Sequence, residues 1–282
     1  MGISVQNVVF SYNKKNPVPT LNNINLNIDS TNEFICILGA TGSGKSTLVQ
    51  LFNALLTPNK GNIQVFDYTI KPKRNKKLKP IRKRIGLVFQ FPEYQLFEDT
   101  VLKDIMFGPL NFGAKKDEAK EKTIEIAKKL HIEDLLDRPP FNLSGGQKRR
   151  VAIAGILVSE PDILILDEPT VGLDPKGKQE LLDILTEYRK STGKTIIVIT
   201  HDMNVVAEYA TRCIVLNKGY LSFDGKPAVL FNNLALLEEN QLALPSISKI
   251  AIYLKDKGLI KFDKIPLKKR ELEAIIRGED HE

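Results

Sequence analysis

The chain of 282 residues has no tryptophan, only two cysteines and three histidines, and no long apolar run. Its longest apolar stretches, around Phe34–Leu38 and Ile196–Ile199, have a handful of residues, whereas a membrane-spanning helix needs about 18 or more. The first residues, Met1–Gln6, have neither the basic nor the apolar region of a secretory signal, and Gln6 stands where a myristoylation signal has Ser or Thr. We therefore expect no signal peptide, no transmembrane segment and a protein that stays in the cytosol.

The scarcity of cysteine and histidine also excludes two kinds of site. Cys36 and Cys213 each lie in an apolar, strand-like run, which predicts two buried small hydrophobic side chains and not a disulfide. A zinc site needs more ligands than two distant cysteines and scattered histidines provide. No motif surrounds His131 or His281, so we expect these two to be structural or surface residues.

Acidic residues are absent from the segment between Lys71 and Arg84, which carries nine lysines and arginines. The net charge of +7 depends on this segment, because without these nine the 41 basic residues no longer outnumber the 34 acidic ones. A nucleic-acid-binding protein usually has a broad basic face, so we expect no nucleic acid partner. The segment is interpreted as a solvated surface loop, and contact with anionic lipid headgroups or an acidic partner is left open.

The first sixty residues have the periodicity of strands followed by a helix. Ile24, Leu26 and Ile28 alternate with polar residues, which predicts an edge strand. The continuous apolar run Phe34–Leu38 predicts a strand that is buried on both faces. A glycine-rich turn follows, and after it a helix is predicted that ends before Pro58. The apolar residues at helical spacing in this helix are Leu48, Leu51, Phe52 and Leu55. A strand, a glycine turn and a helix in this order open an α/β nucleotide-binding fold.

The middle of the chain, from about residue 92 to 158, has the apolar spacing of amphipathic helices. Asp117 is predicted to be the N-cap of a helix over Glu118–His131, and Ser144 the N-cap of the next helix. Buried strands are then predicted at 163–166 and 195–199, separated by a helix with Pro175 in its first turn.

The last part of the chain predicts a hairpin and a small helical module. Cys213–Leu216 and Tyr220–Phe223 are predicted to pair as a hairpin. Beyond about residue 230, one apolar helical stripe ends at Gly258, and Pro266 is predicted to open the last helix. A module of this size is too small to be stable alone, so its apolar stripes need a partner face.

Residues 39–46, which follow the first buried strand, fit the phosphate-binding pattern G-x-x-x-x-G-K-[ST]. The glycines let backbone N–H groups point at phosphate oxygens, and the following helix adds its positive N-terminus. Lys45 is predicted to reach the β- and γ-phosphates of a nucleotide, and Ser46 to ligate Mg²⁺. The predicted nucleotide-binding residues of this segment are Gly39, Ala40, Thr41, Gly42, Ser43, Gly44, Lys45, Ser46 and Thr47.

Two acidic residues close the second buried strand, where a carboxylate is well placed to hold a metal ion. Asp167 is predicted to hold Mg²⁺, directly or through water, and the adjacent Glu168 to polarise an attacking water. Two solvated acids at a strand end are the alternative interpretation, which the upstream phosphate-binding pattern disfavours.

Further motifs, in a fixed order over residues 1–230, resemble those of ATP-binding cassette (ABC) ATPases. The motifs that carry the resemblance are Tyr12 (adenine-stacking aromatic), Gln90 (Q-loop), Leu143-Ser144-Gly145-Gly146-Gln147 (signature), Gly172-Leu173-Asp174 (D-loop) and His201 (switch histidine). The resemblance implies an α/β P-loop NTPase fold with a RecA-like core, an antiparallel β subdomain and a helical signature subdomain. It also implies a domain boundary, with the ATP-binding domain at 1–232, its helical subdomain at about 92–160, and a C-terminal, mainly helical dimerisation module at 233–282.

The mechanism implied by the resemblance needs two such domains, paired head to tail with ATP between them. Each site would combine the P-loop of one subunit with the signature segment of the other, where Ser144 and the following N–H groups form a second anion cradle. The implied catalytic residues are Glu168 as base on water, His201, Lys45 and Gln90. The implied Mg²⁺ ligands are Ser46, Gln90 and Asp167, and the implied residues for the nucleotide beyond the P-loop are Tyr12, Ser144, Gly145, Gly146, Gln147 and Asp174.

Longer segments narrow the resemblance to the energy-coupling factor (ECF) and cobalt-transport ATPases. These segments are Val88–Phe97, Leu143–Gly155 and, in the tail, the stretch from Leu244 to Leu272. Residues 91–94 and 168–174 resemble the second of that family's two paralogous ATPases. The implied function is ATP hydrolysis that drives uptake of vitamins or transition-metal ions across the cytoplasmic membrane.

The implied partners are a second ATPase subunit, a transmembrane coupling protein and small substrate-binding membrane proteins. A heterodimer of ATPases is favoured and a homodimer is possible, and the chain would lie at the cytoplasmic face of the membrane. Glu93 is expected to accept an arginine of the coupling protein. The alternatives are an ATPase of another ABC importer or exporter, or a soluble ABC ATPase, which the single cassette without sustained heptads disfavours.

Overall fold

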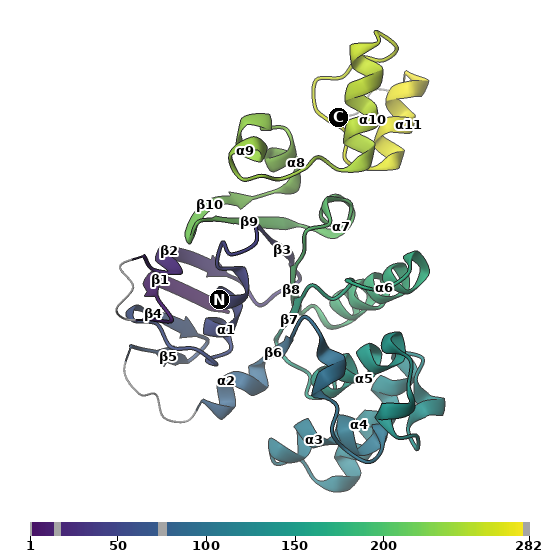
Figure 1. Cartoon of the computed structure of the whole chain (residues 1–282). Helices are drawn as coiled ribbons and strands as arrows, with labels where there is room; N and C mark the ends of the chain where they lie inside the picture. The colour runs from purple at the N-terminus through teal and green to yellow at the C-terminus, as the bar shows by residue number, and fades with distance from the viewer. Residues whose placement is uncertain (1, 14–17, 73–77, 279–282) are drawn as a thin grey trace.

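The computed structural model describes residues 2–13, 18–72 and 78–278, and it places β-sheets at the centre, a helical subdomain on one side and a helical module at the C-terminal end (Figure 1). The prediction for His281 lies outside the described residues. The prediction for the basic segment lies partly outside them, since Lys73, Arg74, Lys76 and Lys77 are not described.

The larger sheet of the described residues has six strands in the order β10-β9-β3-β8-β7-β6. Its strands are β3 (Phe34–Leu38), β6 (Ile85–Val88), β7 (Ile163–Asp167), β8 (Thr195–Ile199), β9 (Arg212–Asn217) and β10 (Tyr220–Gly225). The strands from β9 to β6 are parallel, and β10 is antiparallel to β9 through a tight turn at Lys218 and Gly219, both at positive φ. The predicted hairpin and the predicted buried strands are therefore confirmed.

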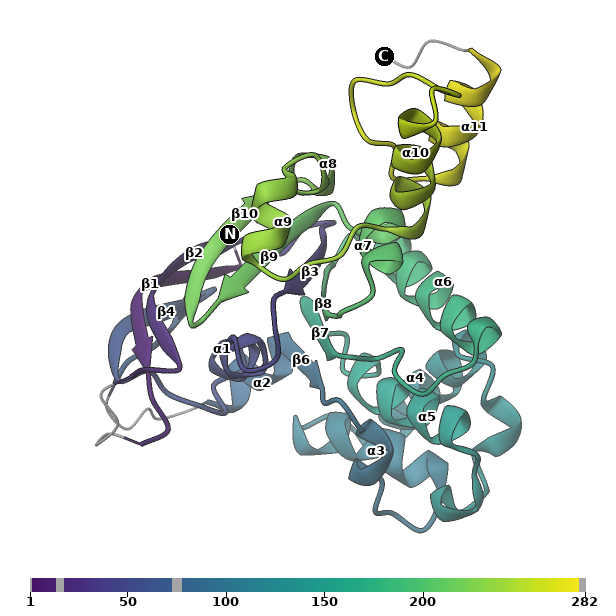
Figure 2. The same cartoon turned by 45° about the horizontal axis from the view of Figure 1, so that its top comes forward.

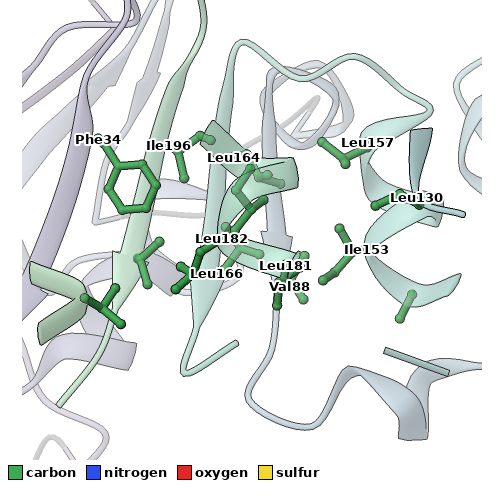
Figure 3. Close-up of a cluster of buried hydrophobic side chains, with 14 of the residues drawn as sticks. Phe34, Val88, Leu130, Ile153, Leu157, Leu164, Leu166, Leu181, Leu182 and Ile196 are labelled. Carbon is green, nitrogen blue, oxygen red and sulfur yellow. The ribbon is translucent and has the colours of Figure 1, made fainter. Parts of the chain in front are cut away.

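Both faces of this sheet are buried, which explains the continuous apolar runs. Successive residues of β3 alternate between two hydrophobic clusters, with Phe34 and Cys36 on one face and Ile35 and Ile37 on the other. The cluster on the Phe34 face also takes side chains of the helical subdomain and of the helix that follows β7 (Figure 3). Parallel strands covered on both faces place their carboxyl ends at one edge, where ligands bind in folds of this class.

The smaller sheet has four antiparallel strands in the order β2-β1-β4-β5. Its strands are β1 (Ile3–Phe10), β2 (Leu21–Ile28), β4 (Lys60–Val65) and β5 (Tyr68–Ile70). In β2 the buried residues include Ile24, Leu26 and Ile28, so the predicted alternation is confirmed. These side chains share the second hydrophobic cluster with Ile35 and Ile37, which packs the small sheet against the large one.

The helices fall into groups around the sheets (Figures 1 and 2). Helices next to the sheets are α1 (Lys45–Phe52), α2 (Lys79–Arg84), α6 (Pro175–Thr192) and α7 (Met203–Tyr209). The helical subdomain contains α3 (Val101–Asn111), α4 (Lys116–Lys129), α5 (Gly145–Leu157) and the 3₁₀ turns Pro92–Gln95, Glu133–Leu135 and Pro140–Asn142. The C-terminal helices are α8 (Pro227–Phe231), α9 (Leu234–Glu239), α10 (Ser246–Asp256) and α11 (Lys269–Arg277).

Three predicted helix ends were wrong. Helix α1 ends at Phe52, because Ala54 adopts a left-handed conformation with φ 55°, and Leu55 is 43% exposed beyond it. Helix α4 begins at Lys116, and Asp117 lies in its first turn rather than at the N-cap. Helix α11 begins at Lys269 and not at Pro266.

The first two helices of the C-terminal part pack against the core, and the last two lie at the far end of the molecule (Figure 2). Leu230 and Phe231 of α8 and Leu237 of α9 belong to the cluster on the Phe34 face. The domain boundary between residues 232 and 233 stays a prediction.

Three exclusions from composition can be compared with the described residues. Cys36 and Cys213 are both buried and both free, as predicted, and they are neighbours across β3 and β9. Within residues 2–13, 18–72 and 78–278, no three His, Cys, Asp or Glu residues group as metal ligands. In that same part of the chain, no helix combines the length and the apolar character needed to cross a bilayer.

Candidate functional site

The loop between β3 and α1 is shaped by glycines that no other residue replaces without strain. Gly39 has φ 135°, and a Cβ atom there would lie 2.1 Å from the backbone oxygen of Leu216 on β9. Gly44 has φ 103° and precedes the first residue of α1, Lys45. The loop therefore leads the chain from the buried strand directly into a helix N-terminus, which is the arrangement that binds phosphate.

A hollow of about 560 Å³ lies in front of this loop. The sequence predictions that the structure brings together there are Tyr12, Thr41, Gly42, Gly44, Lys45, Ser46, Thr47, Gln90, Asp167, Glu168 and His201. We call this the nucleotide hollow. Thr20, Val171 and Ile199 also line it, and the sequence analysis gave them no role in the site, because Val171 and Ile199 were marked only as parts of a longer segment and of a buried strand.

Lys45 is held at the base of the nucleotide hollow. Its Nζ donates hydrogen bonds to the backbone oxygens of Gly39, at 2.9 Å, and Ala40, at 3.0 Å. The residue is only 7% exposed, and burial lowers the pKa of its ammonium, against the opposing effect of the carboxylates Glu168 and Asp167. The lysine is thus a buried cation aimed at the loop that would surround a phosphate chain.

Asp167 and Glu168 end β7 as two adjacent buried carboxyls, 8% and 9% exposed. Glu168 has φ 50°, a conformation that is uncommon outside glycine, and its N–H donates to Ile199 at 3.0 Å. This turn aims the Glu168 carboxyl at the hollow, where its Oε1 lies 3.2 Å from Nε2 of His201. Backbone strain of this kind is typical of functional sites.

Burial determines how the acids and the histidine titrate. Burial, and then the neighbouring Asp167, raise the pKa of Glu168 to about 7. Burial also raises the pKa of Asp167, while a hydrogen bond with Ser46 and the charge of Lys45 lower it. The pKa of His201 is lowered by burial and by Lys45. A carboxyl that titrates near neutral pH beside a neutral imidazole suits a general base.

Tyr12 stands at the open side of the nucleotide hollow. It is 64% exposed, its ring packs edge-on against Phe10 with centroids 4.9 Å apart, and its hydroxyl lies 3.1 Å from Oγ1 of Thr47. One face of the ring is therefore available to a flat partner, as stacking on a base requires.

The donor set at the end of β7 fits Mg²⁺. Ser46 and Asp167 are in hydrogen-bond contact, and Gln90 lines the same hollow. Hydroxyl, carboxylate and amide oxygens are the ligands that Mg²⁺ takes, together with phosphate oxygens. A cation at these oxygens would favour the ionised form of Asp167, whose pKa burial raises.

The signature residues lie outside the nucleotide hollow. Ser144 is the N-cap of α5, its Oγ accepts the N–H of Gln147, and the Gln147 side chain accepts the N–H of Ser144 in return. A second hollow of about 400 Å³, which we call the signature hollow, is lined by Ser144, Gly146, Gln147, Asp174 and neighbours on α5 and α6. Asp174 is the N-cap of α6, where its Oδ1 accepts the N–H of Gly177 at 2.8 Å.

Glu93, which the sequence suggests as the acceptor of an arginine from a coupling protein, already has an arginine of its own chain beside it, and the contact with a coupling protein stays a prediction. Its Oε1 lies 3.4 Å from Nη2 of Arg149 on α5, and the two side chains are only 19% and 6% exposed. The sequence contained Arg149 within a motif but gave no signal that its partner would be a residue 56 positions earlier.

Comparison with known proteins gives a consistent result. A family model described as ABC transporter matches residues 21–171. The Energy-coupling factor transporter ATP-binding protein EcfA2 of Streptococcus thermophilus is 45% identical over 282 residues, covering 99% of this chain and 100% of the relative. The protein of the same name from Streptococcus sanguinis is 47% identical over 285 residues, with the same coverage.

Solved structures agree with the sequence relatives. The structure of cbiO1 from Clostridium perfringens, described as part of the ABC transporter complex cbiONQ, has a TM-score of 0.74 and 39% identity, covering 91% of this chain and 96% of that one. A dimeric ATP-binding cassette in a post-hydrolysis state, bound to ADP and Pi, has a TM-score of 0.72 and 31% identity, covering 80% and 98%.

Proposed function

Since this chain belongs to the ABC transporter family, as an ATP-hydrolysing subunit of the energy-coupling factor type of importer, we propose that its two hollows act in different halves of an ATP sandwich. The nucleotide hollow binds and hydrolyses ATP. The signature hollow completes the nucleotide hollow of a second ATPase subunit. The observation that carries this proposal is the buried Glu168 carboxyl, 3.2 Å from His201, in the hollow that also contains Lys45.

In the proposed reaction the nucleotide hollow positions ATP and activates one water. Tyr12 stacks on the adenine, and the N–H groups of residues 39–47 with Lys45 hold the phosphate chain. Glu168, as carboxylate, takes a proton from the attacking water, and His201 donates from Nε2 to hold the γ-phosphate and that water in line. Gln90 contacts the same water, so a movement of the Q-loop would change the position of that water.

Mg²⁺ fits the oxygens at the end of β7. Ser46, Gln90 and Asp167 are the residues that would hold it, the last directly or through water. When bound, the ion supplies positive charge to the phosphate oxygens and so lowers the barrier to phosphoryl transfer.

The separation of the two hollows within one chain supports pairing with a second cassette. Ser144 and Gly145 at the start of α5 are exposed, and Ser144 lines the signature hollow but not the nucleotide hollow of its own chain. A helix N-terminus with free N–H groups attracts the γ-phosphate of an ATP that another subunit holds. The resemblance to one of two paralogues favours a heterodimer.

A groove beside the Q-loop is the proposed seat of a transmembrane coupling protein. Phe89, Gly108, Phe112 and Gly155 line this groove of about 220 Å³, together with Leu55. Phe91, Tyr94 and Phe97 next to it are 48%, 85% and 56% exposed, which is an unusually apolar surface for a solvated loop. A partner there would hold the chain at the cytoplasmic face of the membrane, with small membrane proteins selecting the vitamin or metal ion.

The C-terminal module is proposed to hold two ATPases together between cycles. Tyr253 of α10 and Ile276 of α11 are 61% and 57% exposed on the module at the far end of the molecule. Deleting residues 246–282, which removes α10 and α11 and keeps Leu237 in the core, should weaken dimerisation in the absence of ATP, measured by light scattering. An unchanged dimer in that truncation would contradict the assignment.

The test of the proposed reaction is Glu168→Gln in the complex purified with its membrane partners. We expect this variant to bind ATP normally, to lose on the order of 10²–10⁴-fold in kcat, and to accumulate as a closed ATP-bound dimer. Exchange of Glu125, an exposed acid on α4 that pairs with Lys129, for Gln is the matched control and should leave hydrolysis unchanged. Hydrolysis at the normal rate by Glu168→Gln would show that the base is another group.

A further inference from the structure

Arg149 contacts three segments that are far apart in the sequence. It lies on α5, two residues after the capping box of Ser144 and Gln147, and is 5% exposed. Its Nη2 lies 3.4 Å from Oε1 of Glu93, while its Nη1 donates to the backbone oxygens of Pro169, at 3.2 Å, and Val171. A guanidinium has donors in several fixed directions and stays charged, so it can join a carboxylate and two carbonyls at once.

Each of these segments carries part of the proposed reaction. Glu93 lies three residues after Gln90, in the 3₁₀ turn that follows the Q-loop. Pro169 is the residue after Glu168, and Val171 lines the nucleotide hollow and donates its N–H to Glu168 at 3.3 Å. Arg149 itself lines the signature hollow.

We propose that Arg149 is a positioning residue, which fixes the turn carrying Glu168 relative to the Q-loop and the signature helix. Glu168 depends on such support because its backbone is at φ 50°, where the turn after it must be held by contacts. Among the described residues the hydrogen bonds and the ion pair of Arg149 reach neither residues 39–47 nor Tyr12, so we expect it to act on the position of the base and not on the ATP that its own chain binds. The inference rests on the proposed role of Glu168.

The pair with Glu93 has a second consequence. Both side chains are largely removed from water, and among the described residues Oε2 of Glu93 and Nε of Arg149 have no hydrogen-bond partner. An incompletely satisfied buried pair can be rearranged when the Q-loop moves, because its present geometry is not the best that the two groups can make. A displacement of Glu93 would then pull on the Arg149 contacts to Pro169 and Val171.

The test is the ATP hydrolysis of the purified transporter complex that contains Arg149→Met. We expect kcat to fall on the order of tenfold to a hundredfold, as for a small displacement of a catalytic group, while the KM for ATP stays within about twofold. Arg149→Lys should not restore kcat, because one ammonium cannot reach the carboxylate and both carbonyls.

Two further variants separate positioning from general stability. Arg212→Met removes a partly buried arginine that pairs with Asp224 and Glu33, and none of these three residues lines either hollow. We expect this variant to have a lower melting temperature without a lower kcat. Glu93→Gln should lower kcat by about threefold or more at constant KM, and adding it to Arg149→Met should cause no further loss.

The inference is overturned if Arg149→Met keeps kcat within about twofold of the wild type, or loses no more than Arg212→Met. Should Arg149→Met fail to fold, Glu93→Gln decides, because a normal kcat in that variant would break the proposed link. Failure of the proposed reaction would be seen elsewhere, as normal hydrolysis by Glu168→Gln.

Discussion

In the proposed function both the nucleotide hollow and the signature hollow contact phosphate, but they differ in how they present their polar groups. The nucleotide hollow contains three charged side chains withdrawn from water, since Lys45, Asp167 and Glu168 are 7%, 8% and 9% exposed. The signature hollow presents an exposed helix start, where Ser144 and Gln147 satisfy each other's backbone N–H groups. The nucleotide hollow therefore relies on buried charge, whereas the signature hollow combines an exposed helix start with the charged side chains of Arg149, Arg150 and Lys176.

This difference indicates a division of labour. Burying charged groups costs folding free energy and shifts their pKa values. Buried charged groups with shifted pKa values are therefore typical of sites where a reaction uses them. A capped helix N-terminus costs little folding free energy, and it can stay exposed to solvent until an anion binds. We therefore expect mutations in the nucleotide hollow to act on binding and chemistry, and mutations at the exposed helix start of the signature hollow, such as at Ser144, to act only when two subunits meet.

The largest effect is expected for Lys45→Ala. The variant loses the cation that would contact the phosphates and the two hydrogen bonds that hold Gly39 and Ala40 in place. Hydrolysis should fall by about 10³-fold or more, and ATP binding to the isolated chain should weaken in equilibrium titration. Exchange of Lys129, an exposed lysine on α4, for Ala is the control. Unchanged ATP binding by Lys45→Ala would contradict the proposal that the nucleotide hollow binds ATP through its buried charge.

The next effect is expected for Ser144→Ala. The isolated chain should bind ATP as the wild type does, because Ser144 does not line the nucleotide hollow. Hydrolysis by the assembled pair should fall on the order of tenfold to a hundredfold, and loss of the N-cap should cost about 1 kcal/mol of stability. Calorimetry and steady-state rates measure both. Weakened ATP binding by the isolated variant would contradict the division of labour.

A smaller effect is expected from pH. Because Glu168 must be ionised to accept a proton and its pKa is about 7, kcat/KM should fall about tenfold for each pH unit below 7. A kcat/KM independent of pH between 5.5 and 7.5 would exclude Glu168 as the titrating base.

The same carboxyl predicts a change of stability with pH. Its folded-state pKa is raised above the ordinary 4.5, so its contribution to stability is present below about 4.5 and is lost as pH rises through 7. Glu168→Gln should therefore raise the melting temperature at pH 8 more than at pH 5, at about 2–4 °C for each kcal/mol regained.

The smallest effect is expected for Tyr12→Ala. Loss of stacking on the base should raise the KM for ATP about tenfold, with kcat nearly unchanged. Tyr12→Phe is the matched control, because it keeps the ring and removes only the hydroxyl that contacts Thr47. If Tyr12→Phe were as damaged as Tyr12→Ala, the hydroxyl contact and not stacking would be the important feature.

Local patterns were sufficient for most of the elements and for the motifs. The buried runs at β3, β7 and β8 were predicted because strands covered on both faces are apolar throughout, and α5 was predicted from its N-cap. The predicted end of α1 and the predicted start of α4 were wrong, because helix ends depend on single backbone conformations that a hydrophobic period does not reveal. The left-handed conformation of Ala54 is one example.

The sequence by itself determined the phosphate loop, the paired acids after β7 and the family, because each is written in consecutive residues or fixed spacings. Only the tertiary structure decided that Glu168 meets His201, that Thr20 and Val171 line the same hollow, and that Glu93 is paired with Arg149. These contacts join residues separated by tens of positions. They arise because parallel strands bring their carboxyl ends to one edge and because the helical subdomain packs on one face of the same sheet.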